Sequence, residues 1–191
     1  LGPIIHNEGV VRDLEEKGVK VLNSENEISA LTEGTVIIRS HGVGREVYAR
    51  LEARGAEIVD ATCPFVKRIH GLVSRAEEEG RLPIIIGTPT HPEVEGIAGW
   101  CTACKIFDSA DSLKKWVTEE RIAADLPICM VCQTTSTENL WKLCRNFAKK
   151  QFTNLKIFDT ICKATEDRQT EAALLSRRSQ AMVVVGDAKS S

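Results

Sequence analysis

The sequence predicts an α/β fold with parallel sheets. Short apolar strands alternate along the chain with segments of helical periodicity, a pattern typical of parallel α/β proteins. An internal repeat indicates that the fold contains similar modules. The chain has 191 residues and a hydrophobic content of 42%, which is sufficient for one or two domains with apolar cores.

Four strands are predicted from apolar runs that each give way to small polar residues. They are residues 35–39, 83–86, 127–131 and 181–185. The segments that follow them contain His41, His91, Thr134 and Ser190. Because ligands of parallel sheets bind where the carboxyl ends of strands meet, we expect these side chains to form one polar pocket for an anionic ligand. For any single strand, the general polarity of loops is an alternative explanation.

Two amphipathic helices are predicted between the strands. The apolar stripe of the first consists of Val66, Ile69, Leu72, Val73 and Ala76. His70 lies on the charged side of this helix, and we expect it to be solvated. The stripe of the second consists of Leu140, Leu143, Cys144 and Phe147, with a cap at residues 136–138. Cys144 is therefore expected to be a core residue.

Residues 56–63 (AEIVDATC) resemble residues 155–162 (LKIFDTIC). Each segment is a short strand that ends in Asp-x-x-Cys and leads into a helix-like segment. Gly87 and Gly186 each lie 24 residues after the corresponding cysteine and end the next apolar run. Equal spacing in equal context favours duplication. Cys63 and Cys162 are then equivalent positions in two modules.

The chain has seven cysteines, an odd number, and no export signal, which argues against a disulfide scaffold. Cys63 and Cys162 each follow a strand and precede a helix, whose N-terminus stabilises a thiolate. Two such thiolates fit a metal centre or a redox pair that forms a reversible disulfide, and two buried cysteines are the third alternative. Two cysteines alone are fewer than the ligands that an iron–sulfur cluster needs.

Two CxxC pairs suggest a different function. Cys101 with Cys104, and Cys129 with Cys132, have the spacing of zinc ligands, so a zinc-stabilised α/β binding module is the alternative. However, Cys129 and Cys132 belong to a predicted strand. Residues three apart on a strand face opposite sides of the sheet, which disfavours a shared ion.

The segment His91-Pro92-Glu93-Val94-Glu95-Gly96 is the most informative motif of the sequence. Pro92 favours an extended His91, and in an extended segment His91 and Glu93 face the same side. In a pocket shielded from water, Glu93 would stay protonated and act as a general acid. A surface loop is the alternative. His6 and His41 also follow apolar runs.

Composition excludes several classes of protein. The net charge is −2 and no basic stripe is present, so nucleic acid is not an expected partner. The longest apolar runs are strand-sized and no signal peptide precedes them, so we expect no membrane span and a cytoplasmic location. The chain starts without methionine and stops soon after an apolar run. We therefore expect a fragment that lacks part of each end.

Six motifs in a fixed order resemble one family, the LytB-type 4-hydroxy-3-methylbut-2-enyl diphosphate reductases of the non-mevalonate isoprenoid pathway. The motifs are His6-Asn7, Ser40-His41-Gly42-Val43, Asp60-Ala61-Thr62-Cys63-Pro64, His91-Pro92-Glu93-Val94-Glu95-Gly96, Gln133-Thr134-Thr135 and Asp159-x-Ile161-Cys162. Each motif alone is weak, but the ordered set is specific, and the resemblance covers essentially the whole chain.

The resemblance implies three α/β modules around a central [4Fe–4S] cluster, with one cysteine ligand from each module. The modules would be residues 1–62, 63–158 and 159–191, the first and third of them incomplete. Cys63 and Cys162 would be cluster ligands, and the third cysteine would lie in an N-terminal segment that this chain does not contain. The fourth iron has no cysteine ligand in this family and is free to bind the substrate oxygen.

The resemblance also implies a reaction, in which the allylic hydroxyl of 4-hydroxy-3-methylbut-2-enyl diphosphate is removed to give isopentenyl and dimethylallyl diphosphate. A ferredoxin or flavodoxin would supply the electrons. Glu93 matches the proton-delivering acid, and Thr134 the hydroxyl that positions the substrate. The positions that match diphosphate contacts are His6, His41, His91 and Ser190, with Ser191 as a polar neighbour. The asparagine expected after Ser191 is absent, so we expect an incomplete site.

Overall fold

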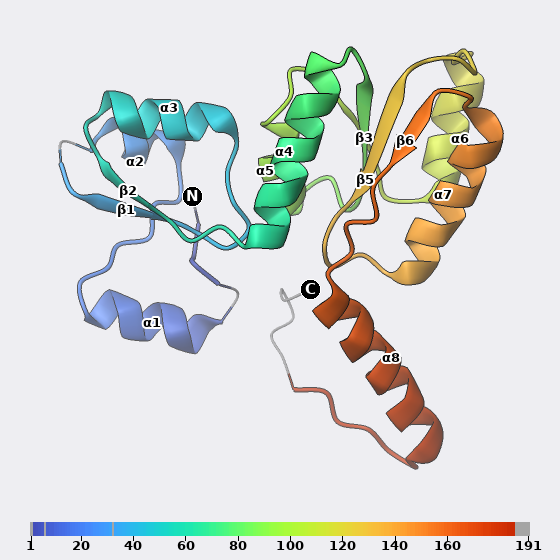
Figure 1. The fold of residues 1–191 in the computed structure, drawn as a ribbon. Helices are drawn as coiled ribbons and strands as arrows, with labels where there is room; N and C mark the ends of the chain where they lie inside the picture. The colour runs from blue at the N-terminus through green and yellow to red at the C-terminus, as the bar shows by residue number, and fades with distance from the viewer. Residues whose placement is uncertain (1, 6, 32, 186–191) are drawn as a thin grey trace.

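The computed structural model describes residues 2–5, 7–31 and 33–185, and it confirms an α/β fold with parallel sheets (Figure 1). The strands are β1 (Thr35–Ile38), β2 (Glu57–Asp60), β3 (Leu82–Ile86), β4 (Lys105–Phe107), β5 (Ile128–Cys132) and β6 (Leu155–Ile157). The helices are α1 (Glu8–Glu16), α2 (Glu25–Ser29), α3 (Arg45–Ala53), α4 (Pro64–Glu78), α5 (Pro92–Ala98), α6 (Ala110–Glu119), α7 (Glu138–Gln151) and α8 (Lys163–Arg178).

The larger lobe is a three-layer sandwich around a parallel sheet of order β4-β3-β5-β6. One face of this sheet packs against α4 and α5, and the other packs against α6 and α7 (Figure 1). Ile84 and Ile86 belong to the core under α6 and α7, whereas Ile85 belongs to the core under α4 and α5. Cys129 and Cys132 likewise fall in opposite cores, as predicted from their spacing on a strand.

The smaller lobe contains the parallel pair β1-β2 with α2 and α3. Its core is small and consists of Ile28, Ile38, Val43 and Leu51. Helix α4 lies between the two lobes (Figure 1). Neither α1 nor α8 contains a buried residue. Among the helices that the structure describes, none combines the length and apolar character that crossing a membrane requires.

The strand order of the larger sheet creates a crevice between β3 and β5. From β3 the chain continues through α5 on one face, and from β5 it continues through α7 on the other. Loops that leave neighbouring parallel strands toward opposite faces form the usual ligand crevice of such sheets. The side chain of Gln133 bridges the two exits, because its Oε1 atom accepts a hydrogen bond from the Thr88 N–H at 3.0 Å.

Three of the four predicted strands are confirmed as β1, β3 and β5, and the predicted helices are α4 and α7. The strand expected at residues 181–185 is wrong. No described residue pairs with this segment, and Val183 and Val185 are 87% and 95% exposed. A β-strand needs a neighbouring strand for its backbone hydrogen bonds, so an apolar run alone does not form one. The module boundaries at residues 62 and 158 stay a prediction.

The two lobes meet through glycines. A Cβ atom at Gly99, which ends α5, would lie 2.5 Å from the Gly44 Cα. Similarly, a Cβ at Gly96 would lie 3.3 Å from the carbonyl oxygens of His41 and Gly42. The Arg45 N–H donates a hydrogen bond to the Gly99 carbonyl at 3.0 Å. The loop after β1 is therefore in direct backbone contact with α5.

We expect Gly99→Ala to lower the free energy of unfolding by about 2 kcal/mol, because the added methyl group would push the Gly44 backbone away. The backbone angle of Gly99, φ −70°, suits alanine, so the cost is steric. Denaturant unfolding measures the change.

The matched control is Gly71→Ala. This glycine is exposed within α4, and its added Cβ would meet no described atom within 4 Å. Alanine should therefore raise stability by about 0.5–1 kcal/mol. Equal effects of the two substitutions would contradict the lobe contact.

Candidate active site

Cys63 and Cys162 occupy equivalent positions, as the internal repeat predicted. Cys63 is the N-cap residue of α4 and Cys162 that of α8, and neither side chain caps its helix. Both thiols are free and half-buried. The Cys63 N–H donates a hydrogen bond to the Ser40 carbonyl at 3.0 Å, and the Cys162 N–H donates to the Thr134 carbonyl at 2.9 Å. Each acceptor lies two residues beyond a strand, β1 or β5.

The exits of β1 and β3 bring two histidines together. The ring centroids of His41 and His91 are 5.4 Å apart, with an edge-to-face angle of 80°. His41 follows β1 in the smaller lobe, and His91 follows β3 in the larger lobe. The backbone contact between the loop after β1 and α5 therefore places both imidazoles at the crevice.

His91 is the N-cap residue of α5, with the extended conformation that Pro92 predicted (φ −76°, ψ 133°). Its Nδ1 atom accepts a hydrogen bond from the Glu93 N–H at 3.1 Å. The extended geometry stops there, because α5 begins at Pro92. The expectation that His91 and Glu93 lie on one face of an extended segment is therefore wrong. Pro at the first helical position, after a polar cap, was the available signal.

Helix α5 directs Glu93 at the loop after β5. Its Oε1 atom accepts a hydrogen bond from the Thr134 N–H at 2.6 Å, and its Oε2 atom lies 2.7 Å from the Thr134 hydroxyl. Glu93 is only 2% exposed and Thr134 6%. Burial raises the pKa of Glu93, although both hydrogen bonds from Thr134 oppose this shift. This agrees with the expectation of a carboxyl group that retains a proton at a higher pH than usual.

A continuous path of contacts thus joins the two cysteines. It runs from Cys63 through the Ser40–His41 loop to His91, and from there through Glu93 and Thr134 to Cys162. Six of the predicted site residues are brought together along it: Cys63, His41, His91, Glu93, Thr134 and Cys162. The other three, His6, Ser190 and Ser191, lie outside the described residues.

His70 is not solvated, contrary to the expectation. It is 3% exposed and stacks on the Trp100 ring at 5.0 Å. A Cβ at Gly42 would lie 2.6 Å from the His70 Cε1 atom, so the histidine packs directly beneath the loop that carries His41. Burial lowers the pKa of His70 to about 4, with smaller opposing effects of Asp60, which raises it, and Lys67, which lowers it further.

Arg39 is a residue of this region that the sequence analysis missed. It follows β1 and directly precedes Ser40 and His41, which was the available signal. Burial lowers the pKa of its guanidinium, while the Glu95 carboxylate raises it. Within the described part of the chain, its buried Nε atom has no hydrogen-bond partner. A cation therefore lies beside the histidine loop.

The available donors fit an iron–sulfur cluster in type but not in number. Thiolates are the ligands that such clusters prefer, and Cys63 and Cys162 supply two. Across the described ranges, no three His, Cys, Asp or Glu residues form a metal-binding group. The four-cysteine zinc site considered as an alternative is wrong, because Cys129 and Cys132 are buried in opposite cores.

Comparison with known proteins gives consistent results. Residues 1–191 match the family model described as LytB protein. The chain is 40% identical over 191 residues to the 4-hydroxy-3-methylbut-2-enyl diphosphate reductase of Caldanaerobacter subterraneus subsp. tengcongensis, an alignment that covers 100% of this chain and 65% of that protein. It is 39% identical to the reductase of the same name from Alkaliphilus oremlandii, covering 100% of this chain and 66% of that protein. The chain therefore spans about 65% of the length of these relatives.

Two solved structures are similar over the whole chain. One is of (E)-4-hydroxy-3-methyl-but-2-enyl diphosphate reductase, with a TM-score of 0.74, 32% identity and coverage of 66% of that chain. The other is of the E-1-hydroxy-2-methyl-but-2-enyl-4-diphosphate reductase from Plasmodium falciparum, with a TM-score of 0.90, 25% identity and coverage of 59% of that chain.

We expect His70 to make stability depend on pH. The unfolded chain binds a proton at this residue below its ordinary pKa of 6.5, whereas the native state does so only near 4. Native stability should therefore fall as pH decreases from 6.5 to 4, by roughly 3 kcal/mol. His70→Phe keeps an aromatic ring on Trp100 and removes this loss. Denaturant unfolding at several pH values measures the free energy of unfolding of both proteins. The same pH dependence of this free energy in the wild-type protein and in His70→Phe would contradict the prediction.

Proposed function

Because the chain belongs to the LytB protein family, we propose that the full-length protein is a 4-hydroxy-3-methylbut-2-enyl diphosphate reductase. The observation that carries the proposal is the path of contacts from Cys63 to Cys162 through two imidazoles, a buried carboxyl group and a hydroxyl. The two longer relatives that bear this name, which are 40% and 39% identical to the chain, support the same activity.

The proposed reaction replaces the allylic hydroxyl of the substrate by hydrogen. Two electrons and two protons are consumed, water leaves, and isopentenyl or dimethylallyl diphosphate is formed. A [4Fe–4S] cluster, when bound, supplies the electrons and a Lewis-acidic site for the hydroxyl oxygen. We infer that an electron-donor protein such as a ferredoxin or flavodoxin reduces it, in the cytoplasm.

Glu93 and Thr134 would deliver the proton that the departing hydroxyl needs. A carboxyl group with a raised pKa keeps its proton to a higher pH than usual, and the 2.7 Å contact gives this proton a path to the Thr134 hydroxyl. The Thr134 N–H, which donates to the other carboxyl oxygen, fixes the orientation of Glu93. The acid is thus held in place before the substrate arrives.

The diphosphate would be bound by His41 and His91, whose rings lie 5.4 Å apart and come from different strand exits. Imidazole N–H groups donate hydrogen bonds to phosphate oxygens. The Arg39 guanidinium beside this loop adds a positive charge that favours the anion. His6, Ser190 and Ser191 would complete the set of donors, as the family resemblance implies.

Cys63 and Cys162 would hold the cluster. Each thiolate would lie at the N-terminus of a long helix, where the helix dipole stabilises negative charge. The remaining cysteines pack in or against the apolar cores: Cys101, Cys104, Cys129, Cys132 and Cys144. We therefore propose that the third thiolate ligand lies outside this chain.

We expect Cys63→Ser to abolish cluster binding in the full-length protein, because serine replaces a thiolate ligand by a hydroxyl. Anaerobic reconstitution, followed by iron counting and visible absorption, measures the loss. Cys144→Ala is the control, since Cys144 is buried under α7 in the apolar core and should leave the iron content unchanged. Iron retained by Cys63→Ser, or lost equally by both variants, would contradict the ligand assignment.

We expect Glu93→Gln to lower turnover by about 10²–10⁴-fold, the range typical of a lost general acid. Glutamine can still accept a hydrogen bond from the Thr134 N–H, so the fold and the iron content should be kept. The control is Glu138→Gln, which changes an exposed carboxylate on α7, the helix that follows the same loop. A Glu93→Gln enzyme with full turnover would exclude Glu93 as the proton donor.

A further inference from the structure

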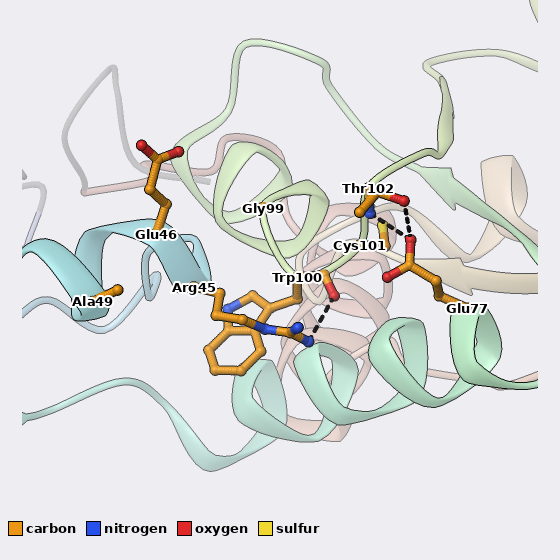
Figure 2. Close-up of a pocket in the computed structure, with 8 residues that line it drawn as sticks. All are labelled: Arg45, Glu46, Ala49, Glu77, Gly99, Trp100, Cys101 and Thr102. Carbon is orange, nitrogen blue, oxygen red and sulfur yellow. Dashed lines mark hydrogen bonds between the residues drawn. The ribbon is translucent and has the colours of Figure 1, made fainter.

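The pair Cys101 and Cys104 lies outside the proposed active site, in the segment between α5 and β4. A pocket of about 300 Å³ reaches it, and Cys101 forms part of the pocket wall together with Arg45, Glu77 and Trp100 (Figure 2). Both cysteines are free and half-buried. Small molecules in solvent therefore have a route to Cys101, one of the two sulfurs of this pair.

The two side chains are in contact. The thiol of Cys101 shares a hydrogen bond with the Cys104 sulfur, and this interaction, together with burial, raises the pKa of Cys101. The same hydrogen bond lowers the pKa of Cys104, against the effect of burial. The two sulfurs are therefore neighbours in a CxxC segment that is neither helix nor strand.

Two charged side chains act in opposite directions on the pKa of Cys101, whose net shift is upward. The Arg45 guanidinium lies over the Trp100 ring, 5.5 Å from its centroid, and its positive charge acts on Cys101. The opposing charge of Glu77 is engaged, because its Oε1 atom accepts hydrogen bonds from the N–H and hydroxyl of Thr102 (Figure 2). These bonds also tie the CxxC segment to α4.

The second CxxC pair is a natural control within the same molecule. Cys129 and Cys132 have the same spacing but lie on β5, where they point to opposite faces of the sheet. They are 1% and 0% exposed. Their side chains cannot meet while the sheet is intact, and no oxidant reaches them.

We propose that Cys101 and Cys104 form a redox-active dithiol, which low-molecular-weight disulfides oxidise to an intramolecular disulfide. The thiolate of one of the two cysteines attacks the small disulfide, whose S–S bond breaks and releases one thiol after protonation. The sulfur of the other cysteine then loses its proton and displaces the second small thiol. In total, the protein dithiol gives up two electrons and two protons, and one small disulfide becomes two thiols.

Oxidation would act next to the contact between the lobes. Cys101 directly follows Trp100, whose indole N–H donates a hydrogen bond to the Val43 carbonyl at 2.9 Å. Val43 belongs to the loop that carries His41. Formation of the disulfide could therefore shift the loop that carries His41. The proposed dithiol does not depend on the proposed reductase activity.

The test is a redox titration of the purified, folded protein under anaerobic conditions with a metal chelator. The protein is equilibrated with mixtures of reduced and oxidised glutathione, blocked with N-ethylmaleimide, digested with trypsin and analysed by mass spectrometry. Trypsin places the two CxxC pairs in separate peptides, residues 82–105 and residues 122–142. Cys63, Cys144 and Cys162 fall in three further peptides.

The expected result is that peptide 82–105 loses both maleimide adducts and two hydrogens in a single two-electron transition. Peptide 122–142 should keep both adducts in the folded protein and oxidise only after denaturation in urea. In Cys101→Ser, the remaining Cys104 should accumulate a mixed disulfide with glutathione. The proposal would be overturned if peptide 82–105 still carried two maleimide adducts after the folded protein had been equilibrated with oxidised glutathione alone. It would also be overturned if both peptides were oxidised to the same extent in the folded protein.

Discussion

The site depends on one backbone contact, the approach of the loop after β1 to helix α5. Gly44 meets Gly99 at a distance that leaves no room for a Cβ atom, and the His41 and Gly42 carbonyls meet Gly96 at a distance that would make a Cβ contact tight. His41 and His91 come from different sheets, so neither sheet alone fixes their separation. The glycine contact sets it, and the Trp100 indole bond to Val43 anchors the same loop from below. The smaller lobe has a core of only a few residues and gains its position from this contact.

The Glu93–Thr134 pair shows how the sheet supports an acid. Burying a carboxyl group in a crevice disfavours its charged form, but an unpartnered buried carboxyl would be costly in either state. Two hydrogen bonds from Thr134, one from the backbone and one from the hydroxyl, satisfy both oxygens. They come from the exit of β5, whereas Glu93 comes from the exit of β3. The crevice of the parallel sheet therefore supplies both the burial and the partners.

Features that depend on local sequence pattern were predicted correctly, whereas features that depend on contacts with a distant segment were not. Strand exits, the Asp-x-x-Cys repeat and the opposite faces of Cys129 and Cys132 follow from periodicity, and the structure confirms them. His70 was misplaced because helical periodicity identifies only the face toward the sheet. Gly42 and Trp100, from other elements, cover its other side. Similarly, the apolar run at residues 181–185 was predicted as a strand, but a strand also needs a neighbouring strand to pair with, which the run itself does not indicate.

The internal repeat places two cysteines, separated by almost one hundred residues, at equivalent points of the proposed site. In both copies a cysteine N–H bonds to a carbonyl two residues beyond the neighbouring parallel strand, Ser40 after β1 and Thr134 after β5. In both, the next residue starts a long helix. Parallel pairing thus fixes each cysteine relative to the polar loop of its neighbour. The partner loops differ, one leading into His41 and the other carrying the hydroxyl of Thr134. Duplication of one supersecondary unit therefore accounts for the equivalent thiols, and divergence of the neighbouring loops accounts for the different side chains beside them, an imidazole in one loop and a hydroxyl in the other.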